Sequence, residues 1–264
     1  MRRLLNLLVG FAAPWRYASA VASIVTASFA VAARPRSWSQ PVRNVLARQI
    51  LFTGLEAVPF VSFIAFLMGV SVVAQAQLWL TRVGQKALLG DILVMIVIRE
   101  AAPLLTNFVV IGRSGTAIAT ELASMRVSGE VHLLEQLGID QFIYLVVPRV
   151  FGVMVSVFCL TVIFVVVSFT SGYITGLAMG VETGHPAVFI RSVFQALTPA
   201  GFLNVAAKTL LPGLTTGALC CFEGLSIRGA ATEVPQAGTR AVVYSVAVLF
   251  LVSAGVSVFT YAVF

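Results

Sequence analysis

The sequence predicts an all-α membrane protein that crosses the bilayer several times, and three observations lead to this prediction. Hydrophobic residues make up 59% of the 264 residues, and charged residues only 10%. The apolar residues form continuous runs, and a membrane-spanning helix needs roughly 20 such residues. These runs do not alternate between apolar and polar positions, as the strands of a membrane β-barrel would require.

The first 50 residues are expected to form an N-terminal helical segment at the membrane surface, followed by a transmembrane domain over residues 51–264. The opening stretch resembles a signal peptide, but Pro14 ends its apolar run early. Several arginines follow and resist translocation, which favours an uncleaved segment on the cytoplasmic face. Residues 17–33 are rich in Ala and Ser and only mildly apolar, so we place them at the interface.

Five later runs are long and apolar enough to cross the bilayer. We expect spans at about residues 57–80, 88–111, 144–179, 203–222 and 241–264. The third is long enough to tilt or to project beyond the bilayer. Glycines repeat every four residues in the third and fourth spans, at Gly172, Gly176, Gly180, Gly213 and Gly217. This spacing predicts helices whose backbones approach closely.

The basic residues predict the orientation of the chain. With a cytoplasmic N-terminus, most of the 17 Lys and Arg residues fall in cytoplasmic segments, whereas Arg82, Lys86 and Arg191 fall outside. Cytoplasmic loops carry an excess of Lys and Arg, so we expect the N-terminus inside and the C-terminus outside. A sixth span over residues 17–33 would invert this distribution.

The connection after the second span, from Gly112 to about residue 143, is expected to contain a short amphipathic helix. Ser128 is a candidate N-cap and Gly138 a candidate C-cap. Apolar residues recur at helical spacing, at Val131, Leu134 and Leu137. The helix either rests on the bilayer surface or docks into a groove of a cytoplasmic partner. The outer connection, residues 181–200, is expected to be partly helical.

Charges at membrane depth are the strongest functional signal. Arg99 and Glu100 follow an apolar run, and Lys208 lies near the start of the fourth span. Such charges are costly unless they are paired or hydrated. Adjacent residues on a helix point roughly 100° apart, so Arg99 and Glu100 need not pair with each other. The charges either fix helix packing or line a substrate path, where Arg99 or Lys208 would suit an anionic head group. Pro103 is expected to kink this helix.

Catalytic and metal-binding patterns are missing from the sequence. His132 and His185 fall in different connections, and the three cysteines have no metal or redox spacing. The sequence has no G-x-x-x-x-G-K-[ST] loop for ATP. We expect no enzyme activity, no metal and no cofactor in this chain. We ascribe the net charge of +7 to cytoplasmic loops and not to nucleic-acid binding.

Several short motifs occur in order between residue 99 and the C-terminus. They are Arg99-Glu100 with Pro103, "GRSGTA" at residues 112–117, "TEL" at 120–122 with Met125, Glu135 with Gly138 and Asp140, Pro148-Arg149, and "GTRAVVYS" at 238–245. From about residue 48 to the end, the chain resembles the MlaE/YrbE family of ABC-transporter permeases, which are partners of MCE proteins.

This resemblance implies a permease subunit that moves phospholipid, or a related lipid, between the bacterial inner membrane and a periplasmic MCE carrier. It implies a homodimer with a lipid cavity between the two protomers that opens toward the periplasm. A cytoplasmic ABC ATPase would bind ATP and Mg²⁺, an MCE-domain protein would bind outside, and an accessory subunit of the STAS type would complete the assembly.

We expect Arg99, Glu100 and Lys208 to line or gate the lipid cavity, with Leu104 and Phe108 against acyl chains. An outer helix near residues 186–199 would meet the MCE protein. The resemblance implies that the connection after the second span receives the ATPase stroke, through Glu121, Arg126, Glu130, Leu134, Glu135, Gly138 and Asp140.

Two functions of other classes stay open. A secondary transporter would use Glu100 as a proton or ion site and would need no ATPase, although the sequence lacks an inverted repeat. A non-transporting scaffold would explain the loop helix but not the charges at membrane depth. An intramembrane enzyme is disfavoured because catalytic groups are missing.

Overall fold

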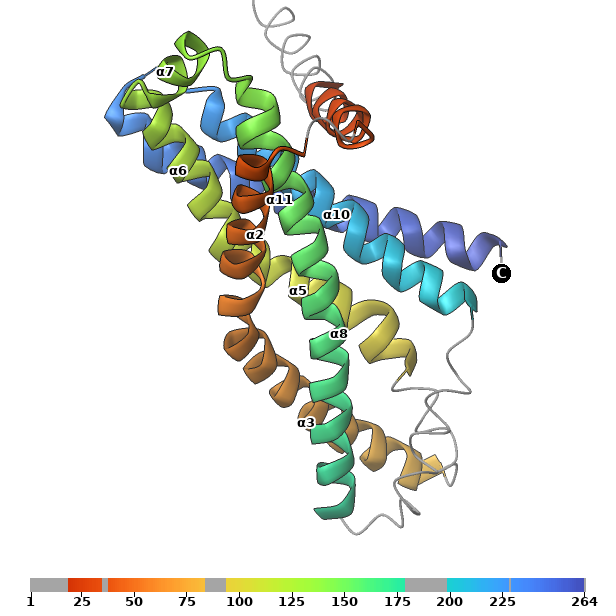
Figure 1. Cartoon of the computed structure of the whole chain (residues 1–264). Coiled ribbons are helices and arrows are strands. Elements are labelled where there is room, and N and C mark those ends of the chain that lie inside the picture. The colour runs from red at the N-terminus through yellow and green to blue at the C-terminus, as the bar shows by residue number, and fades with distance from the viewer. Residues whose placement is uncertain (1–18, 35–37, 84–93, 179–198, 228, 264) are drawn as a thin grey trace, which may run out of the picture.

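The computed structural model describes residues 19–34, 38–83, 94–178, 199–227 and 229–263, and this part of the chain is helical (Figure 1). In chain order the helices are Ser19–Ala32, α2 (Gln40–Thr53), α3 (Val58–Val83), α5 (Ala102–Val110), α6 (Thr116–Val127), α7 (Glu130–Gln136), α8 (Val147–Ala178), α10 (Pro199–Leu225) and α11 (Val234–Val263). Short 3₁₀ turns precede α3 and α11, at Leu55–Ala57 and Ala231–Glu233. π-Helical stretches precede α5, α6 and α8, at Val94–Ala101, Ile111–Gly115 and Phe142–Val146.

Five helices of the described chain are long and apolar enough to cross a membrane, as predicted. They are Gln40–Ala76, Met95–Val127, Phe142–Ala178, Gly201–Leu225 and Ala231–Thr260. The predicted third and fourth spans agree with the helices to within a few residues. The chain is therefore a multi-pass membrane protein. The outer connection and the helix expected near residues 186–199 lie outside the described residues, apart from the start of α10.

The first spanning helix begins well before the predicted residue 57. α2 starts at Gln40 and continues into α3 through one 3₁₀ turn, so residue 50 lies inside a helix. The predicted start is too late because Arg43 and Arg48 lower the local hydropathy. A helix that extends past the hydrocarbon core carries such residues without cost, because its end is in water.

Arg113 holds the junction between α2 and α3. Its Nη1 donates to the carbonyl oxygen of Phe52 at 3.2 Å, and its Nη2 donates to Glu56 Oε2 at 2.8 Å. The guanidinium also lies 5.4 Å from the centre of the Phe52 ring. The "GRSG" motif at residues 112–115 thus ties two spanning helices together, and it is not the start of a loop.

The second spanning helix was predicted to end at residue 111. It continues to Val127 instead. Its predicted first residues, 88–93, lie outside the described chain. Polar residues past position 111 lower the local hydropathy, yet the hydroxyls of Thr116 and Thr120 are satisfied inside the helix. Thr116 Oγ1 donates to the carbonyl oxygen of Gly112 and Thr120 Oγ1 to that of Thr116, both at 2.9 Å. The connection therefore begins only after Val127.

The loop helix α7 forms where it was predicted, but its N-cap is different. The residue before Glu130 is Gly129, which has φ 78°. This left-handed conformation costs a glycine little, because glycine has no Cβ. Ser128 is not the cap: its hydroxyl donates to the carbonyl oxygen of Ser124, at 2.8 Å, and so completes α6.

The end of α7 agrees with the prediction. Gly138 has φ 73°, and the N–H of Ile139 donates to the carbonyl oxygen of Leu134 at 3.0 Å. This is the hydrogen bond of a Schellman C-cap. Val131 is buried and Leu134 is half-buried, whereas Leu137 is exposed. The predicted apolar side of α7 is therefore only partly covered by this chain.

The helix Ser19–Ala32 is about 21 Å long at 1.5 Å per residue. The hydrocarbon core of a bilayer is about 30 Å thick, so the described part of this helix does not span it. The interfacial placement expected for residues 17–33 stays a prediction.

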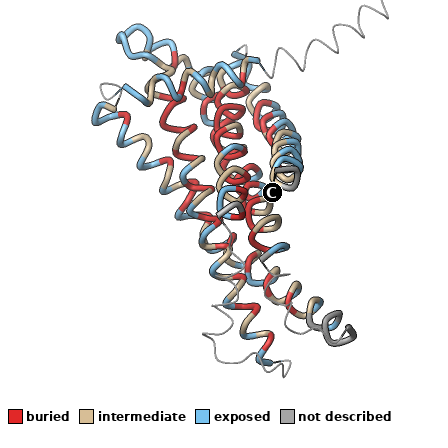
Figure 2. Tube along the Cα trace, turned by 90° about the vertical axis from the view of Figure 1, so that its right-hand side faces the viewer, coloured by how far each residue is buried: buried red, intermediate tan, exposed pale blue. Residues whose placement is uncertain are grey.

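α8 is the central helix, since α2, α3, α5 and α10 all pack against it. Buried residues concentrate along the middle of the bundle, and the ends and outer faces are exposed (Figure 2). Gly213 and Gly217 of α10 face α8, as their spacing predicts. A Cβ on Gly213 would lie 3.3 Å from Met154 Cα, and one on Gly217 would lie 2.8 Å from Val150 Cα. These glycines allow the two backbones to touch.

We predict that Gly217→Ala destabilises the protein by about 1–3 kcal/mol, because the new methyl group meets backbone that cannot yield. Thermal unfolding of the full chain in detergent measures this loss. Gly255→Ala is the matched control, since nothing lies within 4 Å of the Cβ it adds. Equal melting temperatures for the two variants would contradict the contact between α8 and α10.

Candidate functional site

A buried ion pair connects the second and fourth spanning helices. Lys208 lies on α10, and its Nζ is 2.5 Å from Oε1 of Glu100 in the π-helical stretch Val94–Ala101. The same carboxylate oxygen accepts a hydrogen bond from Ser257 Oγ of α11, at 3.2 Å. One oxygen atom of Glu100 thus joins three spanning helices.

Two prolines provide further hydrogen-bond acceptors at this site. Pro103 has no N–H to offer the carbonyl of Arg99, four residues earlier, and Lys208 Nζ donates to this oxygen at 3.2 Å. Pro212 leaves the carbonyl of Lys208 without its helical partner in the same way. Asn107 Nδ2 donates to that oxygen at 3.3 Å and to the Pro103 oxygen at 2.8 Å. The kink expected at Pro103 stays a prediction; the structure shows the π-helical stretch Val94–Ala101 just before this proline.

The two members of the ion pair differ sharply in exposure. The side chain of Lys208 is 1% exposed and that of Glu100 is 42% exposed. A buried ammonium group needs a carboxylate and hydrogen-bond acceptors to offset its lost hydration. Lys208 has both, whereas Glu100 keeps an open side. The pair therefore presents a carboxylate, and not an ammonium group, to whatever lies next to the helix bundle.

The side chain of Arg99 takes no part in this pair. No ion pair or hydrogen bond joins it to another residue of the described chain, and its Nε is buried without a partner there. The expectation that Arg99 and Glu100 need not pair with each other is therefore confirmed. The structure leaves one guanidinium beside the site that no described carboxylate neutralises.

Apolar side chains continue from Glu100 along the same helix. Leu104 and Phe108 follow at intervals of four residues, which places them on one face. Leu104 is half-buried and Phe108 is exposed. The structure thus brings Arg99, Glu100 and Lys208 together. The apolar side chains of Leu104 and Phe108 continue from Glu100 toward the end of the bundle that carries α7.

The residues expected to couple to an ATPase divide into two groups. Glu121 lies on α6 but does not join α7: its Oε1 accepts from Arg149 Nη2 at 2.8 Å. Arg126 is exposed near the end of α6. Glu121 therefore belongs to the packing of α6 on α8, at the end of the bundle that carries α7.

The remaining residues of this set hold α7 and the turn after it. Glu130 accepts a hydrogen bond from the Ser128 hydroxyl at 3.1 Å, and Glu135 accepts one from Gln141 Nε2 at 2.8 Å. Asp140 Oδ1 accepts from the backbone N–H of Phe142 at 2.8 Å, which caps the helix that continues into α8. Gly138 and Leu134 form the C-cap described above. These contacts fix the shape of the connection.

Sequence reasoning missed three residues of the ion-pair site. In the sequence Asn107 and Ser257 are ordinary polar residues of apolar segments, and neither they nor Pro212 were predicted to belong to a site. A signal was present, however: Arg99 and Lys208 each stand four residues before a proline. This spacing marks a charged residue whose own carbonyl is released.

A family model described as Permease MlaE matches residues 46–259. The chain belongs to the MlaE permease family. A probable ABC transporter permease protein of Rickettsia conorii is 30% identical over 210 residues, which cover 80% of each chain. A probable ABC transporter permease protein of Synechocystis is 29% identical over 79% of this chain and 78% of that protein. The chloroplastic protein trigalactosyldiacylglycerol 1 of Arabidopsis thaliana is 29% identical over 79% of this chain and 59% of that protein.

Membership of the MlaE family makes this chain the transmembrane permease of an ABC transporter. A permease of this class works with an ATPase in general, and the chain itself is not expected to be an enzyme. This assignment argues against the ion-coupled secondary transporter and against the scaffold, the two alternatives left open by the sequence.

We predict that Glu100→Ala destabilises this MlaE-family permease more than Lys208→Met does. Loss of the carboxylate leaves a buried ammonium group unpaired, at about 3 kcal/mol or more, whereas loss of the ammonium leaves a half-exposed carboxylate. The double variant Glu100→Ala/Lys208→Met should recover most of the lost stability. Thermal unfolding of the four proteins measures this cycle, and strictly additive effects would contradict the pairing.

Proposed function

We propose that this permease moves phospholipid, or a related lipid, between the bacterial inner membrane and a periplasmic MCE-domain carrier. Two copies of the chain would form the membrane part, and a separate cytoplasmic ATPase would hydrolyse ATP. The observation that carries the proposal is the half-exposed Glu100 on a buried Lys208, beside an unpaired Arg99 and above apolar side chains. Polar head and apolar tail of a lipid would find their partners along one helix.

Arg99 is the group best suited to bind a lipid phosphate at this site. The ammonium group of Lys208 already donates to Glu100 and to a released carbonyl. The guanidinium of Arg99 has no carboxylate partner in the described chain, and its planar set of donors matches phosphate geometry. In this proposal Lys208 and Glu100 hold the site, and Arg99 binds the head group. Leu104 and Phe108 would contact acyl chains.

One comparison supports a lipid substrate. The name of the Arabidopsis relative contains trigalactosyldiacylglycerol, which is itself a lipid. That name says nothing about the head group carried by this chain. The phosphate preference rests on Arg99 alone.

The α7 connection is the part of the chain that we propose contacts the ATPase. Leu133 and Leu137 are exposed apolar residues on and just after α7, next to the acidic residues Glu130 and Glu135. A short helix with uncovered leucines suits a groove of a partner protein. Glu121 and Arg126 would carry the movement into the bundle through α6.

The orientation proposed for the complex follows from the basic residues. Arg126, Arg149 and Arg240 lie in the second half of α6 and near the starts of α8 and α11, at the end of the bundle that carries α7 (Figure 1). An excess of Lys and Arg marks the cytoplasmic side. The ATPase and a STAS-type accessory subunit would bind at that end, and the MCE-domain protein would bind at the other. The N-terminus would be cytoplasmic and the C-terminus periplasmic.

We predict that Arg99→Gln lowers lipid transfer at least tenfold without loss of stability or assembly, because Arg99 has no structural partner to lose in the described chain. The assay follows a fluorescent phospholipid between proteoliposomes and the MCE carrier, with the ATPase and ATP present. Arg43→Gln, an exposed arginine on α2, is the matched control.

Unchanged transfer by Arg99→Gln would overturn the head-group role of Arg99. Transfer that continues without ATP and follows the proton gradient would overturn the ABC mechanism and favour Glu100 as an ion site. Loss of transfer together with loss of the folded protein would instead give Arg99 a packing role.

A further inference from the structure

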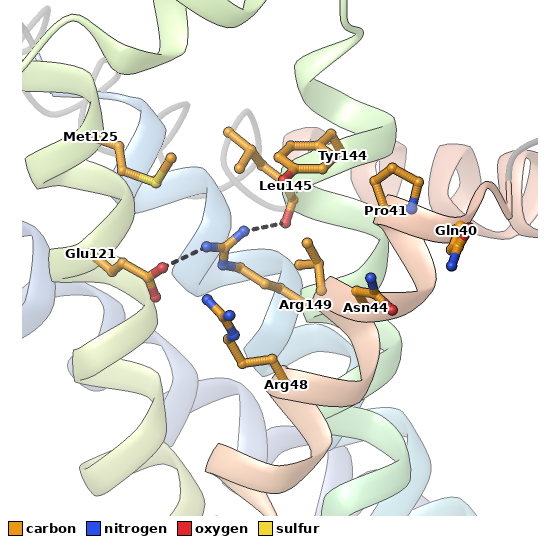
Figure 3. Close-up of a pocket in the computed structure, with 10 residues that line it drawn as sticks. Gln40, Pro41, Asn44, Arg48, Glu121, Met125, Tyr144, Leu145 and Arg149 are labelled. Atoms are coloured by element: carbon orange, nitrogen blue, oxygen red, sulfur yellow. Dashed lines mark hydrogen bonds and ion pairs between the residues drawn. The ribbon is translucent and has the colours of Figure 1, made fainter.

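A cavity of about 490 Å³ lies between α2, α6 and the start of α8, at the end of the bundle that carries α7 (Figure 3). This volume is within the usual range for small-molecule sites. Its polar lining comes from three helices and the stretch before α8, through Gln40, Asn44, Arg48, Glu121, Tyr144 and Arg149. Of the residues that line it, the proposed transport function uses only Glu121, as part of the connection to the ATPase.

Arg149 is the buried charge of the cavity. Its side chain is only 6% exposed, and it donates to Glu121 Oε1 at 2.8 Å and to the carbonyl oxygen of Leu145 at 3.0 Å. Its Nε has no hydrogen-bond partner among the described residues. Glu121 is more than half exposed, at 57%, so this one carboxylate faces the opening and balances Arg149.

Arg48 brings a second positive charge to the same cavity. Figure 3 shows the guanidinium groups of Arg48 and Arg149 close together, both facing Glu121. No ion pair or hydrogen bond of Arg48 is formed with another residue in the described ranges. Two guanidinium groups and one carboxylate leave the cavity with a net positive charge. An anion with several acceptor oxygens, such as a phosphate group, complements this arrangement.

The helix surface that follows Arg48 toward α3 is apolar, and this favours a lipid over a free phosphate. Leu51 and Leu55 follow Arg48 on one face of the helix, at three and seven residues, and are 56% and 65% exposed. Acyl chains of a lipid whose phosphate lies at Arg48 would run along these leucines. A free phosphate ion would gain nothing from them.

The cavity is far from the site at Glu100. Glu100 and Glu121 belong to one continuous helix and are separated by about 30 Å at 1.5 Å per residue. This is about the thickness of the hydrocarbon core of a bilayer. A head group in this cavity therefore lies about 30 Å along the helix from the Arg99 site, and one lipid head group cannot contact both.

We propose that this cavity binds the phosphate of a phospholipid head group in the leaflet on the α7 side of the membrane. Arg48 and Arg149 hold the phosphate, and Leu51 and Leu55 contact the acyl chains. The site goes beyond the proposed transport function, because it is occupied whether or not the bound lipid is ever moved.

The test uses the full chain in a maltoside detergent, whose head group carries no phosphate. The probe is phosphatidylglycerol with a photoreactive diazirine next to its head group, and peptide mass spectrometry maps the adducts. We expect adducts on Met125 and Tyr144, which line the cavity. Arg48→Gln should lower their yield about tenfold. The control Arg43→Gln removes an exposed arginine of the same helix that does not line the cavity, and should change the yield less than twofold.

Two further probes separate the lipid from other ligands. A diacylglycerol with the same diazirine and no phosphate should not label the cavity, and equal labelling would overturn the role of phosphate. Millimolar inorganic phosphate should leave the labelling unchanged. Loss of labelling with inorganic phosphate would overturn the lipid and assign the cavity to the free ion.

Two variants guard against misfolding and against confusion with the transport site. Glu121→Gln removes the competing carboxylate and should raise the yield of adducts, whereas a lower yield would contradict the charge argument. Arg99→Gln should keep full labelling of Met125 and Tyr144. Loss of labelling in that variant would overturn the separation of the two sites.

Discussion

The burial of one ammonium group, that of Lys208, sets the arrangement of the spanning helices around it. A charge so fully removed from solvent requires a carboxylate, and Glu100 provides it from another helix. It also requires backbone acceptors, which helices normally keep for themselves. Pro103 releases one of them, and Asn107 in turn satisfies the carbonyl that Pro212 releases. Hydrogen bonds from side chains thus replace backbone hydrogen bonds. They hold the second, fourth and fifth spanning helices at a fixed height relative to one another.

The same design occurs twice along the second spanning helix. At each end a partly exposed carboxylate, Glu100 or Glu121, is paired with a buried cation from a neighbouring helix. At each end a further arginine, Arg99 or Arg48, stands beside the pair without an ion-pair partner in the described structure. Between them lies helix of mostly apolar and small residues that packs on α8, α10 and α11. The two polar layers are about one hydrocarbon core apart.

Composition and apolar runs were enough to predict an all-helical membrane protein with five spans, because the bilayer imposes length and polarity on each helix. Helix ends were less predictable. Arg43 and Arg48 lower the hydropathy of α2, so its start was predicted too late. Thr116 and Thr120 lower the hydropathy of α6, so its continuation was not predicted, because a hydropathy scale does not account for hydroxyls that donate to the helix backbone. The charged residues of the site could be found from their depth alone. Their partners could not, since the sequence does not tell which faces of distant helices meet, and Asn107 and Ser257 gain importance only through that contact.

The position of Lys208 in the chain has a consequence for biogenesis. Its helix, Gly201–Leu225, is the least apolar of the five spanning helices in the described chain and carries the charge in its first third. Inserted alone, such a segment would meet a penalty for the lysine of at most about 3 kcal/mol, the value for a lysine at the centre of a spanning helix. Glu100 and the carbonyl released by Pro103 belong to a helix made more than a hundred residues earlier. When the lysine leaves the ribosome, its acceptors are therefore already synthesised. The second spanning helix is in place to pair with the fourth as the fourth inserts.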